Sequence, residues 1–290
     1  MSKPLVIGIQ GGKASFHDTA ANHYFGEDIE IVECETFRKL CEVIKLGEVD
    51  FALMAIENSI AGSIMPNYSL LKEFNHKVIG EVKLRIMMNL MALPGQKIED
   101  IKKVMSHYMA LLQCSDFLNQ YPNMEEEKTH DTADSAKIIR EKGLEGVAAI
   151  AGYRAAKVYD LELLASEIET IKQNFTRFLV LQNNNRTNPV KSSNKAMLSF
   201  ELPHKVGSLA ETLKLIVDHK INLTKIQSVP LIGKPDEYTF YVDCEFAKEE
   251  NYHECLSQMQ DYVLNLHVLG EFQKGEFVYD RISSLSLIHI

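Results

Sequence analysis

An arginine between aromatic residues is the most informative chemical feature of the sequence. It lies in the stretch Asn174-Phe175-Thr176-Arg177-Phe178, which opens the apolar run 178–181. A guanidinium can hold a carboxylate through two parallel hydrogen bonds. The stretch therefore indicates a binding site for a carboxylate; the alternative is an ordinary ion pair at the end of a strand.

Polar side chains also follow two other predicted strands. Glu57-Asn58-Ser59 comes after the apolar run 51–56, and Ser106-His107 comes after the run 103–105. Gln113 lies two helical turns beyond Ser106, so it can share the helix face that carries the first turn. Ligands of open α/β sheets bind at the carboxyl edge of the strands, where these groups would meet. The alternative is that the asparagine and the serines are turn formers and helix caps.

Two stretches that resemble catalytic or cofactor signatures lack the required spacing. Ser106 and His107 are adjacent, so their side chains generally point apart, and no nucleophile elbow accompanies them; His107 is interpreted as a structural or positioning residue. The segment 8–13 places glycines after a strand, but a Walker loop requires glycine at Ile7 and serine or threonine at Ala14. We therefore expect a tight turn into a helix and no nucleotide cofactor.

Composition restricts the classes of partner. The sequence has 31 basic and 40 acidic residues, a formal net charge of -9 and no dense lysine or arginine stripe, so nucleic-acid binding is not expected. Long-range attraction will not gather an anionic substrate, and the site must supply its own donors.

The five cysteines form no Cys-x-x-Cys pair, which fits neither a zinc site nor a disulfide framework. No cleavage signal or membrane-spanning run is visible, so we expect a cytoplasmic protein without metal or membrane contact.

Strands and helices alternate through residues 1–182, which predicts an α/β domain with a parallel sheet built of crossover units. The long extended stretch 77–93 can lead the chain into a second lobe, and the run 178–181 is expected to return to the first. The predicted strands are 5–9, 29–32, 51–56, 103–105 and 146–150, and the predicted helices are 16–24, 36–46, 108–118 and 132–141.

A polar stretch, 183–194, is the clearest linker, and a second domain is expected over 195–280. Its order of elements, βαββαβ, is typical of a small ferredoxin-like domain. Its predicted elements are the strand 196–202, the helix 208–219, the strands 223–229 and 238–246, the helix 252–261 and the strand 263–269.

Taken together, these pieces resemble the prephenate dehydratase family across nearly the whole chain and in the expected order. The matching stretches are Gly11-Gly12-Lys13-Ala14-Ser15-Phe16, Ile56-Glu57-Asn58-Ser59 with Gly62-Ser63, Ser106-His107 with Ala110-Leu111 and Gln113-Cys114, Thr132-Ala133 with Ala136, Ala148-Ala149-Ile150-Ala151, and Asn174-Phe175-Thr176-Arg177-Phe178. The resemblance implies two lobes similar to a type II periplasmic binding protein, an active site in the cleft between them and a C-terminal ACT domain.

The resemblance also implies an activity and the residues that carry it. The enzyme would be a carbon-oxygen lyase that converts prephenate to phenylpyruvate in phenylalanine biosynthesis, without a cofactor. Thr176, Arg177 and Phe178 would form the catalytic motif, with Thr176 protonating the leaving hydroxyl and Arg177 anchoring a carboxylate. The substrate pocket would be lined by Glu57, Asn58, Ser59, Ser106 and Gln113.

The sequence departs from the family pattern in several places. In the first loop Gly12 replaces a proline and Ala14 a glycine, and His17 replaces a serine or threonine; Tyr108-Met109 stands where Pro-Gln is customary. These changes concern the rim of the pocket.

The C-terminal domain is expected to sense phenylalanine. Gly207-Ser208-Leu209-Ala210 resembles the Gly-Ala-Leu-Ala motif of the family's ACT domain, whereas Gln227-Ser228-Val229-Pro230 replaces Glu-Ser-Arg-Pro and lacks its acid and arginine. The resemblance implies that phenylalanine binds between paired ACT domains and inhibits, in a homodimer or homotetramer.

Two alternatives remain open on the sequence. An arogenate dehydratase runs the same elimination on the transaminated substrate, and a non-catalytic amino-acid-sensing protein can use the same two-lobed fold. The segment 283–290 has no predicted role.

Overall fold

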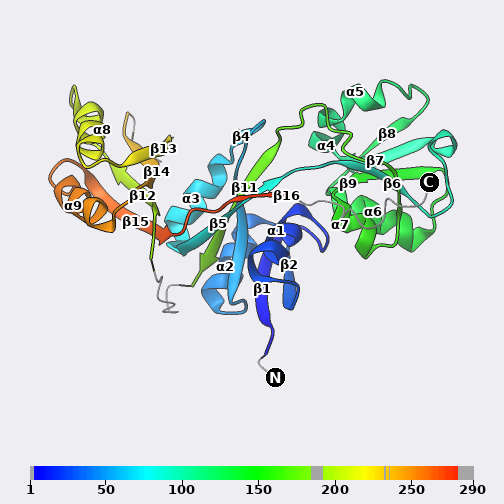
Figure 1. Ribbon diagram of the computed structural model, residues 1–290, viewed down its shortest axis with the longest axis horizontal. Helices are drawn as coiled ribbons and strands as arrows, with labels where there is room; N and C mark the ends of the chain where they lie inside the picture. The colour runs from blue at the N-terminus through cyan, green and yellow to red at the C-terminus, as the bar shows by residue number, and fades with distance from the viewer. Residues whose placement is uncertain (1–2, 184–191, 232, 235, 280–290) are drawn as a thin grey trace.

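Three units lie along one long axis in the computed structural model (Figure 1). The structure describes residues 3–183, 192–231, 233–234 and 236–279, so most of the expected linker 183–194 lies outside the described residues. The first lobe is in the middle, with the second lobe at one end and the C-terminal unit at the other (Figure 1).

The first lobe is built on a seven-stranded mixed sheet with the order β16-β5-β11-β3-β1-β2, in which β4 pairs with β3. Its strands are β1 (Leu5–Gln10), β2 (Ile29–Cys34), β3 (Phe51–Asn58), β4 (Gly62–Ser63), β5 (Lys77–Arg85), β11 (Phe175–Gln182) and β16 (Phe277–Tyr279), and its helices are α1 (Phe16–Phe25), α2 (Phe37–Leu46) and α3 (Met65–Phe74). As expected, Thr36 caps α2, accepting a hydrogen bond from the Lys39 N–H at 3.1 Å.

The prediction of a parallel sheet is right for only part of this lobe. β1 pairs in parallel with β2 and β3, whereas β11 is antiparallel to both β3 and β5. The reason is the chain path, because β5 leads out of the lobe and β11 leads back into it. The sheet is therefore mixed.

The second lobe has a five-stranded mixed sheet with the order β10-β6-β9-β7-β8. Its elements are β6 (Asn89–Ala92), the 3-10 turn Ile98–Asp100, β7 (Lys103–His107), α4 (Tyr108–Gln113), α5 (Ser115–Leu118), β8 (Glu125–Thr129), α6 (Thr132–Lys142), β9 (Val147–Ala151), α7 (Tyr153–Val158) and β10 (Glu162–Ala165). The single helix expected over 108–118 is divided at Cys114.

The two segments that join the lobes run side by side. The Ile168 N–H donates to the Met88 carbonyl at 2.8 Å, the Met88 N–H donates to the Glu169 carboxylate at 2.9 Å, and the Ile86 N–H donates to the Asn174 carbonyl at 2.7 Å. These two hydrogen-bonded segments connect the lobes, and a cleft lies between the lobes.

The C-terminal unit has the expected βαββαβ order and an antiparallel sheet, β13-β14-β12-β15. Its elements are β12 (Lys195–Glu201), α8 (Ser208–Asp218), β13 (Asn222–Pro230), β14 (Tyr238–Glu245), α9 (Glu249–Met259) and β15 (Leu264–Phe272). Beyond it, β16 returns to the first lobe and pairs in parallel with β5, a strand that the sequence did not predict.

One apolar core joins the C-terminal unit to the first lobe. Met197, Tyr241, Leu269 and Phe272 from the C-terminal sheet belong to the same buried cluster as residues of α2, α3, β3 and β11. The sheet therefore lies between the first lobe and its own helices, and the unit is packed against the lobe as well as tethered to it.

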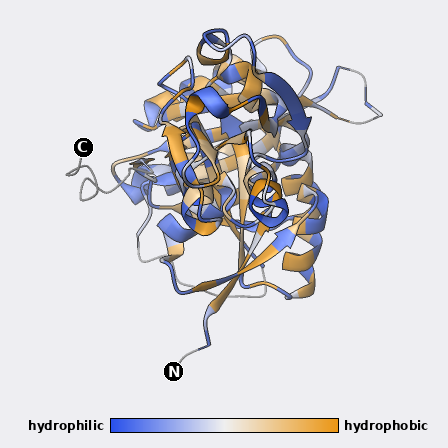
Figure 2. Cartoon of the chain, turned by 90° about the vertical axis from the view of Figure 1, so that its right-hand side faces the viewer, coloured by the Kyte–Doolittle hydropathy of each residue, from blue (hydrophilic) through white to orange (hydrophobic). Residues whose placement is uncertain are grey.

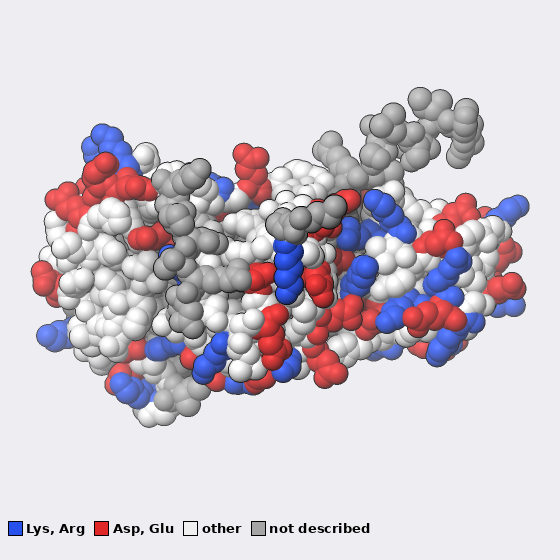
Figure 3. Space-filling model, turned by 90° about the horizontal axis from the view of Figure 1, so that it is seen from below, with Lys and Arg blue, Asp and Glu red and all other residues white. Residues whose placement is uncertain are grey.

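The surface and the interior follow the usual separation of polar and apolar residues. Viewed onto the second lobe, hydrophilic stretches line the outside and hydrophobic ones lie toward the middle (Figure 2). On the face shown in Figure 3, acidic and basic side chains alternate over the second lobe. No helix in the described part of the chain has the length and apolar character needed to cross a membrane.

Candidate active site

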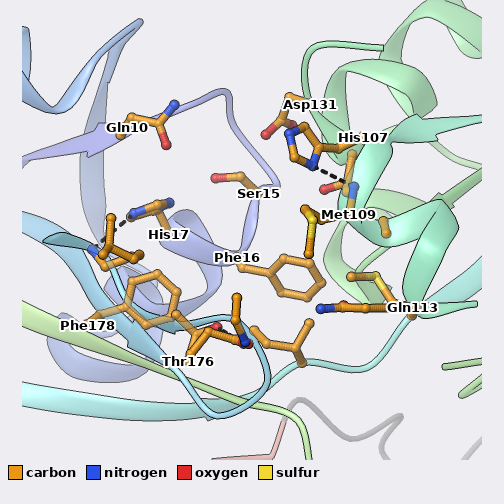
Figure 4. Close-up of a pocket in the computed structure, with 18 of the residues that line it drawn as sticks. Gln10, Ser15, Phe16, His17, His107, Met109, Gln113, Asp131, Thr176 and Phe178 are labelled. Atoms are coloured by element: carbon orange, nitrogen blue, oxygen red, sulfur yellow. Dashed lines mark hydrogen bonds between the residues drawn. The ribbon is translucent and has the colours of Figure 1, made fainter. Parts of the chain in front are cut away.

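A cavity of about 330 Å³ lies in the cleft and takes its walls from both lobes (Figure 4). Its polar lining residues are Gln10, Ser15, His17, Asn58, His107, Gln113, His130, Asp131, Thr132 and Thr176, and its apolar ones include Phe16, Phe37, Ile64, Ile86, Met88, Met109 and Phe178. The size suits a small organic molecule with one ring.

Thr176 and Asn58 face each other across the β11–β3 ladder, and both line the cavity. The Asn58 amide nitrogen donates to the Thr176 hydroxyl oxygen at 3.0 Å. The Asn58 amide oxygen accepts from the backbone N–H groups of Ile60 and Ala61, each at 2.9 Å, which fixes the orientation of the amide. Because its oxygen already accepts a hydrogen bond, the Thr176 hydroxyl can direct its own proton to a ligand.

Asn174 connects this pair to the second lobe. Its side-chain oxygen accepts from Asn58 at 2.8 Å, and its nitrogen donates to the Gln113 side-chain oxygen at 3.1 Å. The Gln113 amide nitrogen then faces the cavity (Figure 4). A chain of hydrogen bonds thus runs from Gln113 through Asn174 and Asn58 to Thr176, and it holds donors from both lobes in place.

His17 is a further cavity residue, at a position where the sequence departs from the family pattern. Its Nε2 accepts from the Ala55 N–H at 3.3 Å, at the point where the β3–β11 pairing shifts register, and its Nδ1 points into the cavity (Figure 4). Burial lowers the pKa of His17 to about 3. The imidazole is therefore neutral at physiological pH, with the proton on Nδ1.

Phe178 contributes an apolar wall. Its ring packs edge-on against His17, with ring centroids 4.8 Å apart, and it is almost fully buried. This contact supports the orientation of the imidazole.

The structure corrects the expectation that Arg177 holds a substrate carboxylate. Neighbouring residues of a strand point to opposite faces, so Thr176 faces the cleft and Arg177 faces the C-terminal unit. Its Nε donates to Glu81 at 2.6 Å and its Nη1 to Asp243, and Lys195 donates to Glu81 at 3.0 Å. These four side chains form a buried charge cluster, and the bidentate contact with a ligand is replaced by contacts within the protein.

Within the charge cluster, the two cations stabilise the negative charge of the buried carboxylates. Burial alone would raise the pKa of the Glu81 carboxyl, but the charges of Arg177 and Lys195 hold it below its ordinary value. The ordinary ion pair at a strand end, which was the alternative for Arg177, is what the structure shows.

Three other expected pocket residues also lie outside the cavity. Glu57 is the neighbour of Asn58 on β3 and points the opposite way, where its carboxylate accepts from Lys225 of the C-terminal unit at 2.6 Å. The Ser59 hydroxyl donates to the Gln173 carbonyl at 3.1 Å, and the fully buried Ser106 hydroxyl donates to the Ile150 carbonyl at 2.6 Å. Strand alternation accounts for Glu57, and hydrogen bonds to carbonyls of neighbouring segments engage the two serines.

His107 and Asp131 occupy the second-lobe side of the cavity and cap helices. His107 Nδ1 accepts from the Met109 N–H at 3.2 Å at the start of α4. Asp131 Oδ1 accepts from the N–H groups of Ala133 and Asp134, at 2.7 and 3.3 Å, at the start of α6. Asp131 was not expected as a site residue, although it directly precedes the Thr132-Ala133 match.

The expected sensing residues lie in the C-terminal unit at two places. Gly207, with a φ of 92°, begins α8, and Ser208 and Leu209 line a separate cavity of about 470 Å³; Ala210 follows them within α8. Gln227 and Ser228 lie on the edge strand β13 and do not line that cavity.

Comparison with known proteins identifies the family. A family model described as prephenate dehydratase matches residues 7–186, more than half of the chain. The chain belongs to the prephenate dehydratase family. It is 35% identical over 276 residues to arogenate dehydratase/prephenate dehydratase 2 of Arabidopsis thaliana, which covers 92% of this chain and 72% of the relative.

Solved structures share the fold of this family member. A protein described as GqqA, a novel type of quorum quenching acylase, has a TM-score of 0.83 at 25% identity and covers 92% of this chain and 97% of its own. Prephenate dehydratase from Arthrobacter aurescens, solved in complex with L-Phe, has a TM-score of 0.79 at 23% identity, with 93% of this chain and 90% of its own covered.

Proposed function

We propose that the chain catalyses the decarboxylative dehydration of prephenate, or of its amine analogue arogenate, in the cleft between the lobes. The observation that carries the proposal is the Thr176–Asn58 pair inside a cavity of about 330 Å³. Family membership supports it, as does the Arabidopsis relative, whose name contains both activities.

The reaction needs few chemical groups from the protein. The bond from the ring to its carboxylate breaks and releases CO2, the electron pair moves into the ring, and the bond to the para hydroxyl breaks. The hydroxyl leaves as water after taking one proton, and the ring becomes aromatic, which supplies the driving force. The enzyme must therefore hold the reactive conformer and assist the departing hydroxyl.

Thr176 is the group that assists the leaving hydroxyl. Its Oγ1 accepts from Asn58, so its own proton is directed to the cavity, and the donated bond stabilises the negative charge that develops on Oγ1 as the proton leaves. Gln113 supplies a neutral donor from the other lobe, held through Asn174.

The apolar walls favour the loss of CO2. The cavity lining includes the apolar side chains of Phe16, Ile64, Ile86, Met88 and Phe178, which would pack against the ring of a bound substrate. A carboxylate in such surroundings is poorly solvated, whereas CO2 and an aromatic ring are neutral, so the environment favours the charge-dispersed transition state.

We also propose that the C-terminal unit is an ACT domain that binds phenylalanine and pairs with a second copy. Support comes from the Gly207 turn into α8, from the βαββαβ order, and from the Arthrobacter structure, which was solved in complex with L-Phe. Calorimetric titration with phenylalanine tests this, and the absence of both binding and inhibition would contradict it.

The proposed reaction is tested by a direct assay. Purified protein is mixed with prephenate or arogenate, and the formation of phenylpyruvate or phenylalanine is followed. Conversion of at least one substrate is expected, and conversion of neither would overturn the proposal.

We also propose that the enzyme is cytoplasmic and that it forms a homodimer or homotetramer.

A further inference from the structure

In its described lining, the cavity lacks the positively charged side chains that a purely anionic substrate would favour. Within the described part of the chain, no lysine or arginine lines it, and Arg177 is engaged by Glu81 and Asp243 on the other side of the sheet. Of the described residues that line it, Asp131 is the only acidic one, and the other ionisable side chains are His17, His107 and His130.

Asp131 has one carboxylate oxygen available. Oδ1 accepts both capping bonds of α6, and among the described residues no donor is bonded to Oδ2. A Cβ placed on Gly11 would lie 3.4 Å from Oδ2, so this glycine keeps the space in front of the oxygen open. Burial raises the pKa of Asp131, and the nearby Asp134 carboxylate acts in the same direction.

The position of Asp131 in the cavity indicates which end of the substrate it would contact. Thr176 and Asp131 lie at opposite ends of the cavity (Figure 4). In both substrates the leaving hydroxyl and the three-carbon side chain occupy para positions of the ring. With the hydroxyl at Thr176, the side chain therefore extends toward Asp131.

We propose that Asp131 is a specificity-determining residue that binds the α-ammonium group of arogenate through Oδ2 and makes the amine-bearing substrate preferred over the keto acid. The inference rests on the proposed function. Prephenate and arogenate share both carboxylates and differ only at this α position, where arogenate carries an ammonium group and prephenate a carbonyl. An ammonium donates to Asp131 and neutralises its charge, whereas a carbonyl oxygen facing a carboxylate is repelled.

The test compares the two substrates in the full chain and in two variants. We expect wild-type kcat/KM for arogenate to exceed that for prephenate by about 10-fold or more. Asp131→Asn keeps the helix cap, because asparagine is an equally good N-cap residue. It should lower kcat/KM for arogenate by about 10- to 100-fold, the worth of a hydrogen bond between charged groups, and should not lower that for prephenate, because the repulsion between the carboxylate and the carbonyl is removed.

Asp134→Asn is the matched control. It removes a carboxylate from the same first turn of α6 but does not line the cavity, so the ratio of the two kcat/KM values should stay as in the wild type. Wild-type preference for prephenate, or an equal loss for both substrates in Asp131→Asn, would overturn this inference alone. Turnover of neither substrate would overturn the proposed function and this inference with it.

Discussion

Thr176 and Arg177 are sequence neighbours with different partners. The Thr176 hydroxyl meets Asn58 inside the cleft, and the Arg177 guanidinium meets Glu81 and Asp243 behind the sheet. The same division holds on β3, where Asn58 faces the cleft and Glu57 contacts Lys225. On each of these two paired strands, one residue faces the cavity and its sequence neighbour contacts other parts of the protein behind the sheet.

The pH dependence of stability follows from His17. Burial lowers its pKa from 6.5 to about 3, so between these values the unfolded chain binds a proton that the native state does not. Stability should therefore fall as the pH drops through this range. His17→Gln keeps an acceptor for the Ala55 N–H but cannot titrate, so it should remove this part of the acid sensitivity.

Denaturant unfolding at a series of pH values measures the effect. The advantage in unfolding free energy of the wild type over His17→Gln should shrink as the pH is lowered. An advantage that stays constant or grows would show that His17 is already protonated in the native state.

The sequence predicted which segments reach the cavity better than it predicted the direction of each side chain. Thr176, Phe178, Asn58 and Gln113 line the cavity, and their roles toward a substrate stay predictions. Arg177, Glu57 and Ser106 were expected there because strand ends gather at one edge of a sheet, yet which face each side chain takes depends on register. Asp131 and His17 also line the cavity, although the sequence marked them only indirectly: Asp131 precedes the Thr132-Ala133 match, and His17 departs from the family pattern at the pocket rim.

At the scale of elements, the charge cluster links four strands: β11, β5, β12 and β14. Arg177→Met leaves Glu81 and Asp243 buried without their main partner, which should lower the free energy of unfolding by about 3–5 kcal/mol. Equilibrium unfolding in denaturant is the measurement. Because the guanidinium contacts Glu81 and Asp243 behind the sheet, the substitution should leave the Michaelis constant unchanged.

An exposed ion pair provides the control for Arg177. Arg38 contacts Glu73 at 2.6 Å with both side chains about half exposed, so Arg38→Met should cost less than about 1 kcal/mol. If Arg177→Met were as stable as Arg38→Met and instead raised the Michaelis constant, the guanidinium would have to contact the substrate after all.

Helices and strands with a clear hydrophobic periodicity were predictable from the sequence. Strands that form only by pairing with a distant strand were not. All six elements of the C-terminal unit agree with the predicted order, because their apolar alternation and helix periodicity are clear. The strand β8, with the sequence Glu-Glu-Glu-Lys-Thr, has no apolar pattern and forms by pairing with β7. The strand β16 likewise depends on an open edge of β5, which lies far away in the sequence.

At the scale of the whole molecule, the C-terminal sheet leaves β13 as an open edge. Ile226 is 45% exposed on this strand, and open edges tend to pair with another chain. We expect light scattering to give two or four times the mass of one chain, and Ile226→Lys to shift the population toward monomer. Leu46→Lys, an exposed site on the first lobe, should not.

A monomeric wild type would contradict the paired arrangement of the C-terminal units. Equal effects of Ile226→Lys and Leu46→Lys would place the contact elsewhere on the surface.

The turnover number of Thr176→Val tests the central claim most directly. Valine keeps the shape of threonine but has no proton to donate, so kcat should fall by about 10²- to 10⁴-fold with a small change in KM, while Thr176→Ser should recover most of the activity. Near-normal turnover by the valine variant would show that this hydroxyl does not assist the leaving group.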